Sequence, residues 1–276
     1  LWCTSGIPAP EHARSSEARR LAQEAALQCK RNRDAYAKDS GLYQNTILRL
    51  SEQIRSCIQV HSQTETERSR SGRLDSPRVW RAAVLEDGNV FLRDVATCKP
   101  GSSVDLLLDG SASRMHCQEA IAAQGYILAE SLGRCGVPVR VTSFCSLRGY
   151  TVLRVLKGFA DKNENQKIFN YFAAGWNRDG LALRAAGDLI KSAPEGRHLL
   201  LLLTDASPND SHRIPPGEGN PFGREYAEQA AVKDTTQEVR AVQGRGIRVA
   251  AVFMGNNYSA PDAAAIYEKS MVRIQG

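Results

Sequence analysis

The sequence predicts an α/β fold in which a doubly wound, mostly parallel sheet carries helices on both faces. Short, largely apolar segments recur after residue 100, separated by longer segments in which apolar residues repeat every three or four positions. This alternation is typical of parallel strands joined by helical crossovers. One apolar strand, residues 199–204, is followed directly by an aspartate, at the kind of strand end where doubly wound sheets bind ligands.

The length of 276 residues leaves room for one such domain, of roughly 170–200 residues, and a smaller appendage. We expect a helical N-terminal region and linker over residues 1–75, and the α/β domain with a leading β-hairpin over residues 76–276. The composition, 42% hydrophobic and 24% charged residues, is ordinary for a globular protein. No segment offers the roughly 18 uncharged apolar residues that a membrane span requires.

The cysteines and the first residues indicate the compartment. Seven cysteines without a C-x-x-C pair predict neither a zinc knuckle nor a disulfide framework. The segment 1–4 lacks the basic and then apolar layout of a signal peptide. We therefore expect a cytoplasmic protein.

Two helices are predicted before residue 62. A break at residues 39–41 separates them and predicts a helical hairpin. A polar, arginine-rich segment follows at residues 62–76; we interpret it as a solvated linker, with docking to an acidic partner or to nucleic acid as the alternative. The apolar stripe of the second helix comprises Ile47, Leu50, Ile54, Cys57, Ile58 and His61.

The remaining elements follow from apolar runs and turn residues. Residues 79–84 and 90–95 flank a turn-forming segment and predict a β-hairpin. The long proline-rich loop 206–223 directly follows a core strand, where loops are often functional. The core strands are expected at residues 104–108, 139–144, 151–156, 199–204 and 248–253, and the helices at residues 115–132, 166–173, 181–191 and 224–243.

The first core strand runs into a D-x-S-x-S motif formed by Asp109, Ser111 and Ser113. One carboxylate and two hydroxyls then converge within one turn. These hard oxygen donors favour Mg²⁺ or Mn²⁺ over zinc or copper. For this triplet alone, a helix N-cap without any metal is the competing interpretation.

Two further segments offer donors at neighbouring strand ends. Asp205 ends an apolar strand as Asp109 does, and Asn177 and Asp179 precede a predicted helix. Donors from three segments favour a metal site over a simple cap. Which of Asn177 and Asp179 faces the ion stays open, because an amide oxygen is a weaker donor than a carboxylate. Asp105 lies within a strand and is expected to be a hydrogen-bonded structural residue.

These motifs resemble the von Willebrand factor A domain with its metal-ion-dependent adhesion site, over residues 103–276. Segments 123–127, 177–180 and 203–210 are similar to the bacterial nitric oxide reductase activation protein group, which is related to the T subunit of cobaltochelatase. Two residues depart from the pattern of A domains: Asn177 stands where most have threonine, and Ala206 where glycine is usual. The resemblance implies a site for Mg²⁺, with Mn²⁺ or Ca²⁺ as alternatives, at Asp109, Ser111, Ser113, Asp205 and Asn177 or Asp179.

The expected function is metal-ion-dependent protein binding. The resemblance implies that an acidic side chain of a partner completes the coordination of the ion, and that the partner is an AAA+ ATPase, a target metalloprotein, or both, in metalloenzyme activation or metal insertion. Neither a P-loop nor a G-x-S-x-G elbow occurs, so we expect no enzymatic activity of the chain itself, which would be a non-catalytic subunit of an ATPase or chelatase complex. We expect neither a nucleic-acid partner nor a membrane span. The alternative is a Mg²⁺-dependent phosphatase or nuclease using Asp109, Asp179 and Asp205.

Overall fold

A computed structural model describes residues 1–6, 10–61, 64–85, 87–96, 102–194, 196–215 and 223–274. The chain divides into two compact units. The first comprises Leu1–Ser51 and Gly101–Gly276, and the second comprises Glu52–Pro100. The boundary expected between residues 75 and 76 lies inside the second unit.

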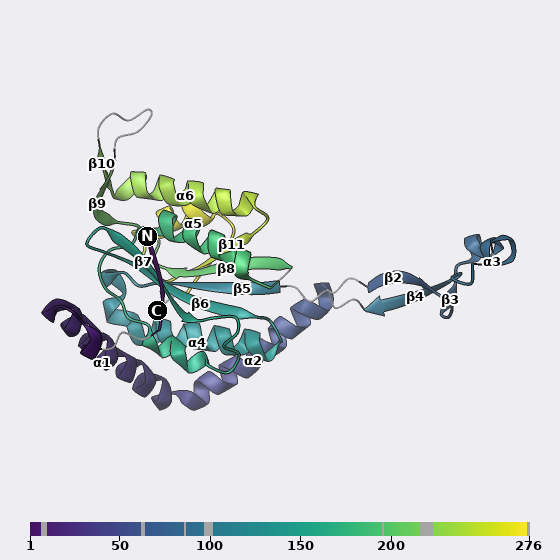
Figure 1. The fold of residues 1–276 in the computed structure, drawn as a ribbon, viewed down its shortest axis with the longest axis horizontal. Coiled ribbons are helices and arrows are strands. Elements are labelled where there is room, and N and C mark those ends of the chain that lie inside the picture. Colours follow the sequence, from purple (N-terminus) through teal and green to yellow (C-terminus); the bar gives the residue numbers. More distant parts are fainter. Residues whose placement is uncertain are drawn as a thin grey trace. The chain divides into compact units, whose positions relative to one another are not determined.

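A seven-stranded sheet forms the centre of the first unit (Figure 1). Its strands are β1 (Trp2–Ser5), β5 (Ser102–Asp109), β6 (Val139–Leu147), β7 (Tyr150–Lys157), β8 (Arg197–Thr204), β11 (Arg248–Phe253) and β12 (Met271–Arg273). They lie in the order β1-β7-β6-β5-β8-β11-β12. β7 runs antiparallel to β6 and carries β1 parallel to itself, while β6, β5, β8, β11 and β12 are parallel to their neighbours. The mostly parallel sheet of the prediction is confirmed.

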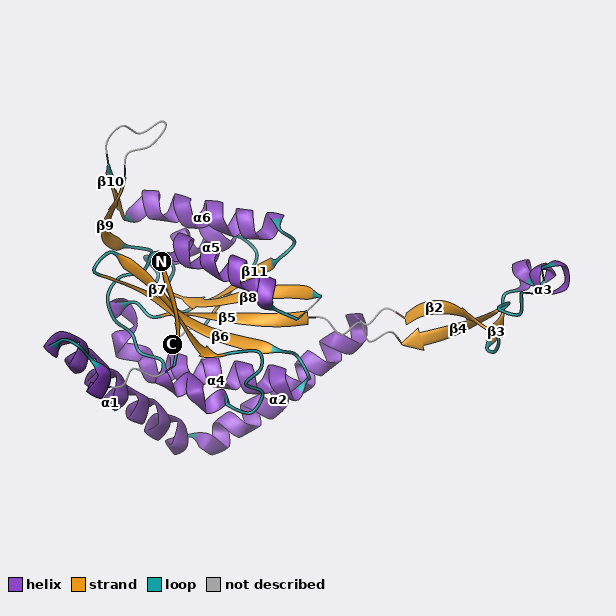
Figure 2. Ribbon diagram, viewed as in Figure 1, coloured by secondary structure: helices purple, strands orange, loops and turns teal. Residues whose placement is uncertain are grey.

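Helices cover both faces of the sheet (Figure 2). α5 (Asp179–Leu189), α6 (Glu228–Gly244) and α7 (Ala260–Tyr267) cover one face, and α4 (Gln118–Arg134) covers the other. The remaining long helices are α1 (Ser16–Lys38) and α2 (Ser40–His61). Short 3-10 helices η1, η3, η4 and η5 span Pro10–His12, Ala112–Cys117, Asn165–Asn170 and Ile190–Ser192. The predicted helix over residues 166–173 is therefore only a 3-10 segment.

Alternating side chains of β5 enter two separate cores. Leu107 packs with residues of α5, α6 and α7 on one face. Leu106 and Leu108 pack with residues of α4 and η4 on the other. Since successive side chains of a strand point to opposite faces, the apolar run is what a strand covered on both sides requires. Each fully buried leucine contributes about 1.5–3 kcal/mol relative to an exposed one.

The predicted helical hairpin is wrong. Only Asp39 separates α1 from α2, which is too short for the reversal of direction that an antiparallel helix pair needs. Tyr36 and Tyr43 stack across this break with ring centroids 5.1 Å apart. α1 packs on α4 and η4, and the first half of α2 reaches α4 through Ser51, whose Oγ donates to the Ser131 carbonyl at 3.4 Å.

The second unit contains a three-stranded antiparallel sheet in the order β2-β4-β3. Its elements are β2 (Thr64–Ser69), β3 (Arg73–Leu74), η2 (Ser76–Arg78), α3 (Trp80–Val84) and β4 (Phe91–Ala96). The predicted strand at residues 90–95 is confirmed as β4, whereas the one at residues 79–84 is wrong, because that segment forms α3. A short apolar run fits either structure, and its two alanines favour the helix. The expected linker, residues 62–76, contains β2 and β3.

The loop expected at residues 206–223 contains a strand, β9 (Asp210–Ile214), which pairs antiparallel with β10 (Arg224–Tyr226). The strand β10 delays the start of α6 to Glu228. None of the helices in the described ranges is both long and apolar enough to cross a bilayer.

Candidate metal site

The predicted site residues lie where the order of the sheet reverses. From the central strand β5 the chain proceeds to β6 on one side, and β8 joins β5 on the other. The carboxyl ends of β5 and β8 therefore form the switch point at which ligands bind in doubly wound sheets. Asp109 is the last residue of β5, and Asp205 follows the last residue of β8.

The turn after β5 places its oxygen atoms close together. Asp109 is fully buried, its Oδ1 accepts from the Ser111 amide at 2.9 Å, and its Oδ2 accepts from the Thr204 hydroxyl at 3.3 Å. Gly110 lets the turn press against β6, since a Cβ there would lie 2.9 Å from the Phe144 carbonyl oxygen. The absence of a side chain at this position is therefore a packing requirement.

Serine hydroxyls link the two strand ends. Ser111 Oγ lies 2.9 Å from Ser113 Oγ, which donates to Asp205 Oδ2 at 2.7 Å. The motif and the second aspartate thus form a continuous chain of oxygen atoms between β5 and β8. The structure brings together Asp109, Ser111, Ser113 and Asp205 as predicted.

The third segment presents an aspartate and an asparagine that differ in their partners. Asn177 Nδ2 donates to Asp179 Oδ1 at 3.0 Å, and Asn177 Oδ1 accepts from the Asn209 amide at 3.2 Å. Asp179 is fully buried, and its Oδ2 has no hydrogen-bond partner among the residues that the structure describes. The amide oxygen of Asn177 is therefore used within the loop, while Asp179 retains an unpaired oxygen.

Burial and mutual repulsion act on these carboxylates. Burial, followed by the charge of Asp205, raises the pKa of Asp109 to about 7. Burial also raises the pKa of Asp179 well above its usual range, and the charges of Asp109 and Asp205 add to this. Buried carboxylates whose negative charges raise the pKa of a neighbouring carboxylate favour a cation close to them.

Arg114 supplies one positive charge to this cluster. Its Nη2 lies 2.5 Å from Asp205 Oδ2, and its Nη1 donates to the Met254 carbonyl at 3.1 Å. Sequence reasoning missed this residue, because an arginine after the motif is typical of a surface. The register of the short helix after Ser111 could have indicated it, since Arg114 lies one 3-10 turn beyond Ser111 and is the buried member of η3.

Tyr171 was also missed. Its hydroxyl is fully buried and donates to the backbone carbonyl of Asp109. The hydroxyl therefore holds the backbone of Asp109, the first residue of the candidate site, from the side of η4. No spacing in the sequence relates Tyr171 to the motif, which lies 62 positions earlier.

The residues present fit a hard divalent cation. Carboxylate and hydroxyl oxygens are the ligands that Mg²⁺, Mn²⁺ and Ca²⁺ bind. Asp179 Oδ2 is a buried oxygen without a hydrogen-bond partner in the described ranges, so it is available to an ion. Within the described ranges, no three histidine, cysteine, aspartate or glutamate side chains are grouped so as to hold an ion by themselves. A ring of Asp109, Asp179 and Asp205 directly around one ion is therefore not formed, and an ion here would need the serine hydroxyls.

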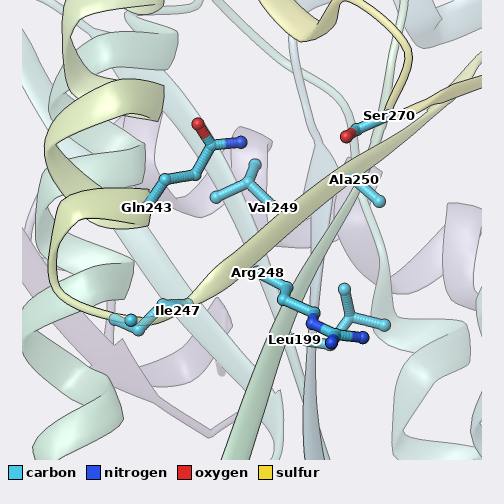
Figure 3. A pocket seen from close by; sticks show the side chains of 8 residues that line it. Leu199, Gln243, Ile247, Arg248, Val249, Ala250 and Ser270 are labelled. Atoms are coloured by element: carbon cyan, nitrogen blue, oxygen red, sulfur yellow. The ribbon is translucent and has the colours of Figure 1, made fainter.

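A separate cleft of about 420 Å³ lies near the amino ends of β8 and β11 (Figure 3). None of the predicted site residues lines it. Its lining comprises Leu199, Gln243, Gly246, Ile247, Arg248, Val249, Ala250 and Ser270. The cleft therefore lies away from the switch point and has no part in the candidate site.

Comparison by sequence gives a short match. No protein-family model matches the chain. A stretch of 115 residues is 31% identical to an uncharacterized protein of Pseudomonas aeruginosa, covering 40% of this chain and 18% of that protein. The chain thus spans about a fifth of the length of this relative.

Comparison by structure finds bacterial pilus proteins. The D319A mutant of the PilB minor pilin from Streptococcus sanguinis is similar with a TM-score of 0.50 and 15% identity, over 65% of this chain and 58% of that one. The pilus adhesin SpaC from Lactobacillus rhamnosus GG is similar with a TM-score of 0.49 and 15% identity, over 65% of this chain and 28% of that one. The vWF domain of the type V pili tip protein Mfa5 from Porphyromonas gingivalis is similar with a TM-score of 0.46 and 10% identity, over 63% of this chain and 89% of that one. At such identities, the similarity to PilB is one of fold.

Proposed function

We propose that this chain is a protein-binding module of the von Willebrand factor A type whose site holds a divalent cation, Mg²⁺ or alternatively Mn²⁺ or Ca²⁺. The observation that carries the proposal is the surplus of buried carboxylates at the switch point. Asp109, Asp179 and Asp205 act on one another there, the guanidinium of Arg114 pairs with Asp205, and Asp179 Oδ2 has no hydrogen-bond partner in the described ranges. A bound cation would offset this charge.

Within this proposal the residues have different roles. Asp109, Ser111 and Ser113 are the donors that would hold the ion, because they lie on one tight turn. Asp205 supports them through Ser113. Of the two residues that the sequence left open, we assign Asp179 rather than Asn177 to the ion, since only Asp179 has a free oxygen.

Binding a partner is the use that such a donor set favours. An ion held by few protein oxygens keeps coordination positions for outside ligands, and a carboxylate of another protein can occupy one of them. The hydrolase alternative requires carboxylates gathered directly around the ion. In the described part of the chain they are not so gathered, and Arg114 already pairs with Asp205.

The identity of the partner rests on the sequence resemblance alone. Segments 123–127, 177–180 and 203–210 support an AAA+ ATPase as partner, in the activation of a metalloenzyme or in metal insertion. A cytoplasmic location stays a prediction of the same kind. A pull-down with a co-encoded ATPase, in Mg²⁺ and in EDTA, tests this part; capture that EDTA does not change would argue against an ion-dependent contact.

The ion site is tested by calorimetric titration of the chain with Mn²⁺ and Mg²⁺. We expect one ion per chain, and loss of binding in Asp109→Ala. Asp34→Ala, which removes an exposed carboxylate of α1, is the matched control and should bind as the unaltered chain does. Binding that survives Asp109→Ala, or no binding at millimolar ion, would overturn the proposal. Turnover of a phosphate ester that Asp109→Ala abolishes would favour the hydrolase instead.

A further inference from the structure

We propose that Asn32 of α1 is a positioning residue for the ion site, acting through residues 169–175, which we call the strap. The expected consequence of this role, a change in ion affinity, rests on the proposed function. The geometry on which it is built is independent of any ion. It makes the N-terminal helix α1 part of the site, although no residue of α1 belongs to the donor set.

The side chain of Asn32 is fully buried and fully used. Its Nδ2 donates to the Phe169 carbonyl at 2.8 Å and to the Tyr171 carbonyl at 2.9 Å. Its Oδ1 accepts from Gln28 Nε2 at 2.9 Å, and the same nitrogen donates to Glu119 of α4 at 2.8 Å. One amide group that holds two carbonyls two residues apart fixes the backbone between them.

The strap contacts the backbone of the motif itself. The Tyr171 hydroxyl donates to the Asp109 carbonyl, and the Ala174 amide donates to the Gly110 carbonyl at 2.7 Å. At its far end, the Gly175 carbonyl accepts from the Ala112 amide at 2.9 Å. One segment thereby holds the backbone of the turn at Asp109, Gly110 and Ala112.

The far end of the strap has no room to shift. Gly175 has a positive φ of 72°, and a Cβ there would collide with the Ser146 carbonyl. In the middle, the Ala173 amide donates to Gln118 Oε1 at 2.7 Å. With this end fixed on β6 and α4, Asn32 sets the position of the near end, which carries Tyr171.

Attachment of α1 alone does not account for Asn32. The ring of Tyr36 in α1 contacts those of Tyr126 and Phe169, with centroids 4.8 and 5.2 Å apart, and supplies apolar packing. Burying an amide costs free energy unless its hydrogen bonds are made, and a satisfied buried network specifies one arrangement. Both hydrogen bonds that Asn32 donates are made to the strap, so the arrangement that this network specifies is the position of the strap.

The test compares Asn32→Leu with Ser51→Ala. Leucine keeps a similar volume and removes the bonds to the strap. Ser51 is buried in the same helical layer, and its Oγ donates to the Ile47 and Ser131 carbonyls, away from the strap. Hydrogen exchange of the Ala112 amide in ion-free protein and the Kd for Mn²⁺ are measured in both. In Asn32→Leu we expect about tenfold faster exchange and about tenfold weaker binding, and no change in Ser51→Ala.

Tyr171→Phe probes the same link from its other end while keeping the aromatic packing, and it serves if Asn32→Leu does not fold. The double variant Asn32→Leu/Tyr171→Phe should bind Mn²⁺ as tightly as the single variant with the lower affinity, because both changes break the same connection. Unchanged exchange and unchanged Kd in folded Asn32→Leu or Tyr171→Phe would overturn the inference. If the unaltered chain binds no Mn²⁺ while exchange still responds, the proposed function fails and the positioning role stands.

Discussion

Two buried arginine–aspartate pairs lie at different ends of the central sheet. Arg140 and Asp105 pair toward the amino ends of β6 and β5, and Arg114 and Asp205 pair at the carboxyl edge. In both, nitrogen and oxygen are 2.5 Å apart, and the arginine and aspartate side chains are 7% and 6% exposed. Distance and burial therefore cannot distinguish a structural ion pair from one in a binding site.

Their surroundings do distinguish them. Arg140 Nη1 also donates to the Leu189 carbonyl at 3.1 Å and to Ser192 Oγ at 3.0 Å, and among the described residues burial, not a second carboxylate, raises the pKa of Asp105. Arg114 pairs with Asp205, whose charge also raises the pKa of Asp109, and the charges of Asp109 and Asp205 raise the pKa of Asp179. Surplus charge, rather than an ion pair as such, marks the candidate site.

The largest effect is expected at the structural pair. Arg140→Met leaves Asp105 buried without its cation, and removing one partner of a buried pair costs about 3–5 kcal/mol. Urea unfolding should show this loss of free energy of unfolding equally in Mg²⁺ and in EDTA. If Mg²⁺ restored the stability of Arg140→Met, the pair of Arg140 and Asp105 would respond to the ion, and the distinction between the two ends of the sheet would be wrong.

A dependence on pH is expected from the carboxyl edge. The pKa of Asp109 rises from an ordinary 3.8 to about 7 in the folded chain, so the folded state binds a proton more tightly than the unfolded state does. Its contribution to stability is present below about pH 4 and is lost as pH rises to about 7. At about 1.4 kcal/mol per pKa unit, this amounts to a few kcal/mol.

Urea unfolding of ion-free protein from pH 4 to 7 measures this effect, with Asp109→Asn as the control that lacks the titrating group. The decline in stability should be smaller in the control and in Mg²⁺. An equal decline in Asp109→Asn would assign the effect to other groups.

Arg114→Met should cost as much as Arg140→Met in EDTA but less in Mg²⁺. It leaves Asp205 buried without its cation, which costs about 3–5 kcal/mol in EDTA. With the positive charge of Arg114 removed, the variant should bind the cation more tightly than the unaltered chain does. Each tenfold gain in affinity over the unaltered chain returns about 1.4 kcal/mol, so the difference in stability should narrow in Mg²⁺. Melting temperatures in the two buffers decide, and a loss of the same size in both would make Arg114 a structural residue like Arg140.

Ser113→Ala is expected to have the smallest effect. Ser113 is exposed and its Oγ bridges Ser111 and Asp205, so stability should fall by about 1 kcal/mol or less. Calorimetric titration should show Mn²⁺ affinity about tenfold lower. Unchanged affinity would remove Ser113 from the donor set.

The sequence predicted those strands that are buried on both faces. The runs at residues 106–108 and 199–203 are apolar, and their side chains are buried or partly buried in the two cores. By contrast, β1 is exposed along its length, and β2 alternates threonine with glutamate, so neither carries a hydrophobic period. α3 was mistaken for a strand because five residues cannot separate a period of 2 from one of 3.6.

For the site, the motif sufficed for residues near one another in sequence. Asp109, Ser111 and Ser113 are recognisable together, and Asp205 by its place after a strand. The sequence does not predict the contacts through which the other residues act, which are Arg114, Tyr171 and Asn32. A weak signal existed for Asn32: with Gln28 it stands four residues apart on the helix face that carries Ala22 and Ala25, where a polar residue requires a buried partner.

The hydrogen bonds of Asn32 join residues 137 and 139 positions apart, and this separation has a consequence for the order of assembly. During synthesis α1 leaves the ribosome long before the segment on which it docks has been made. Contacts that close such long loops form slowly, because chain entropy must be lost first. Docking of α1 is therefore expected to be a late step of folding, and a newly made chain should acquire full affinity for the proposed ion only after α1 has docked.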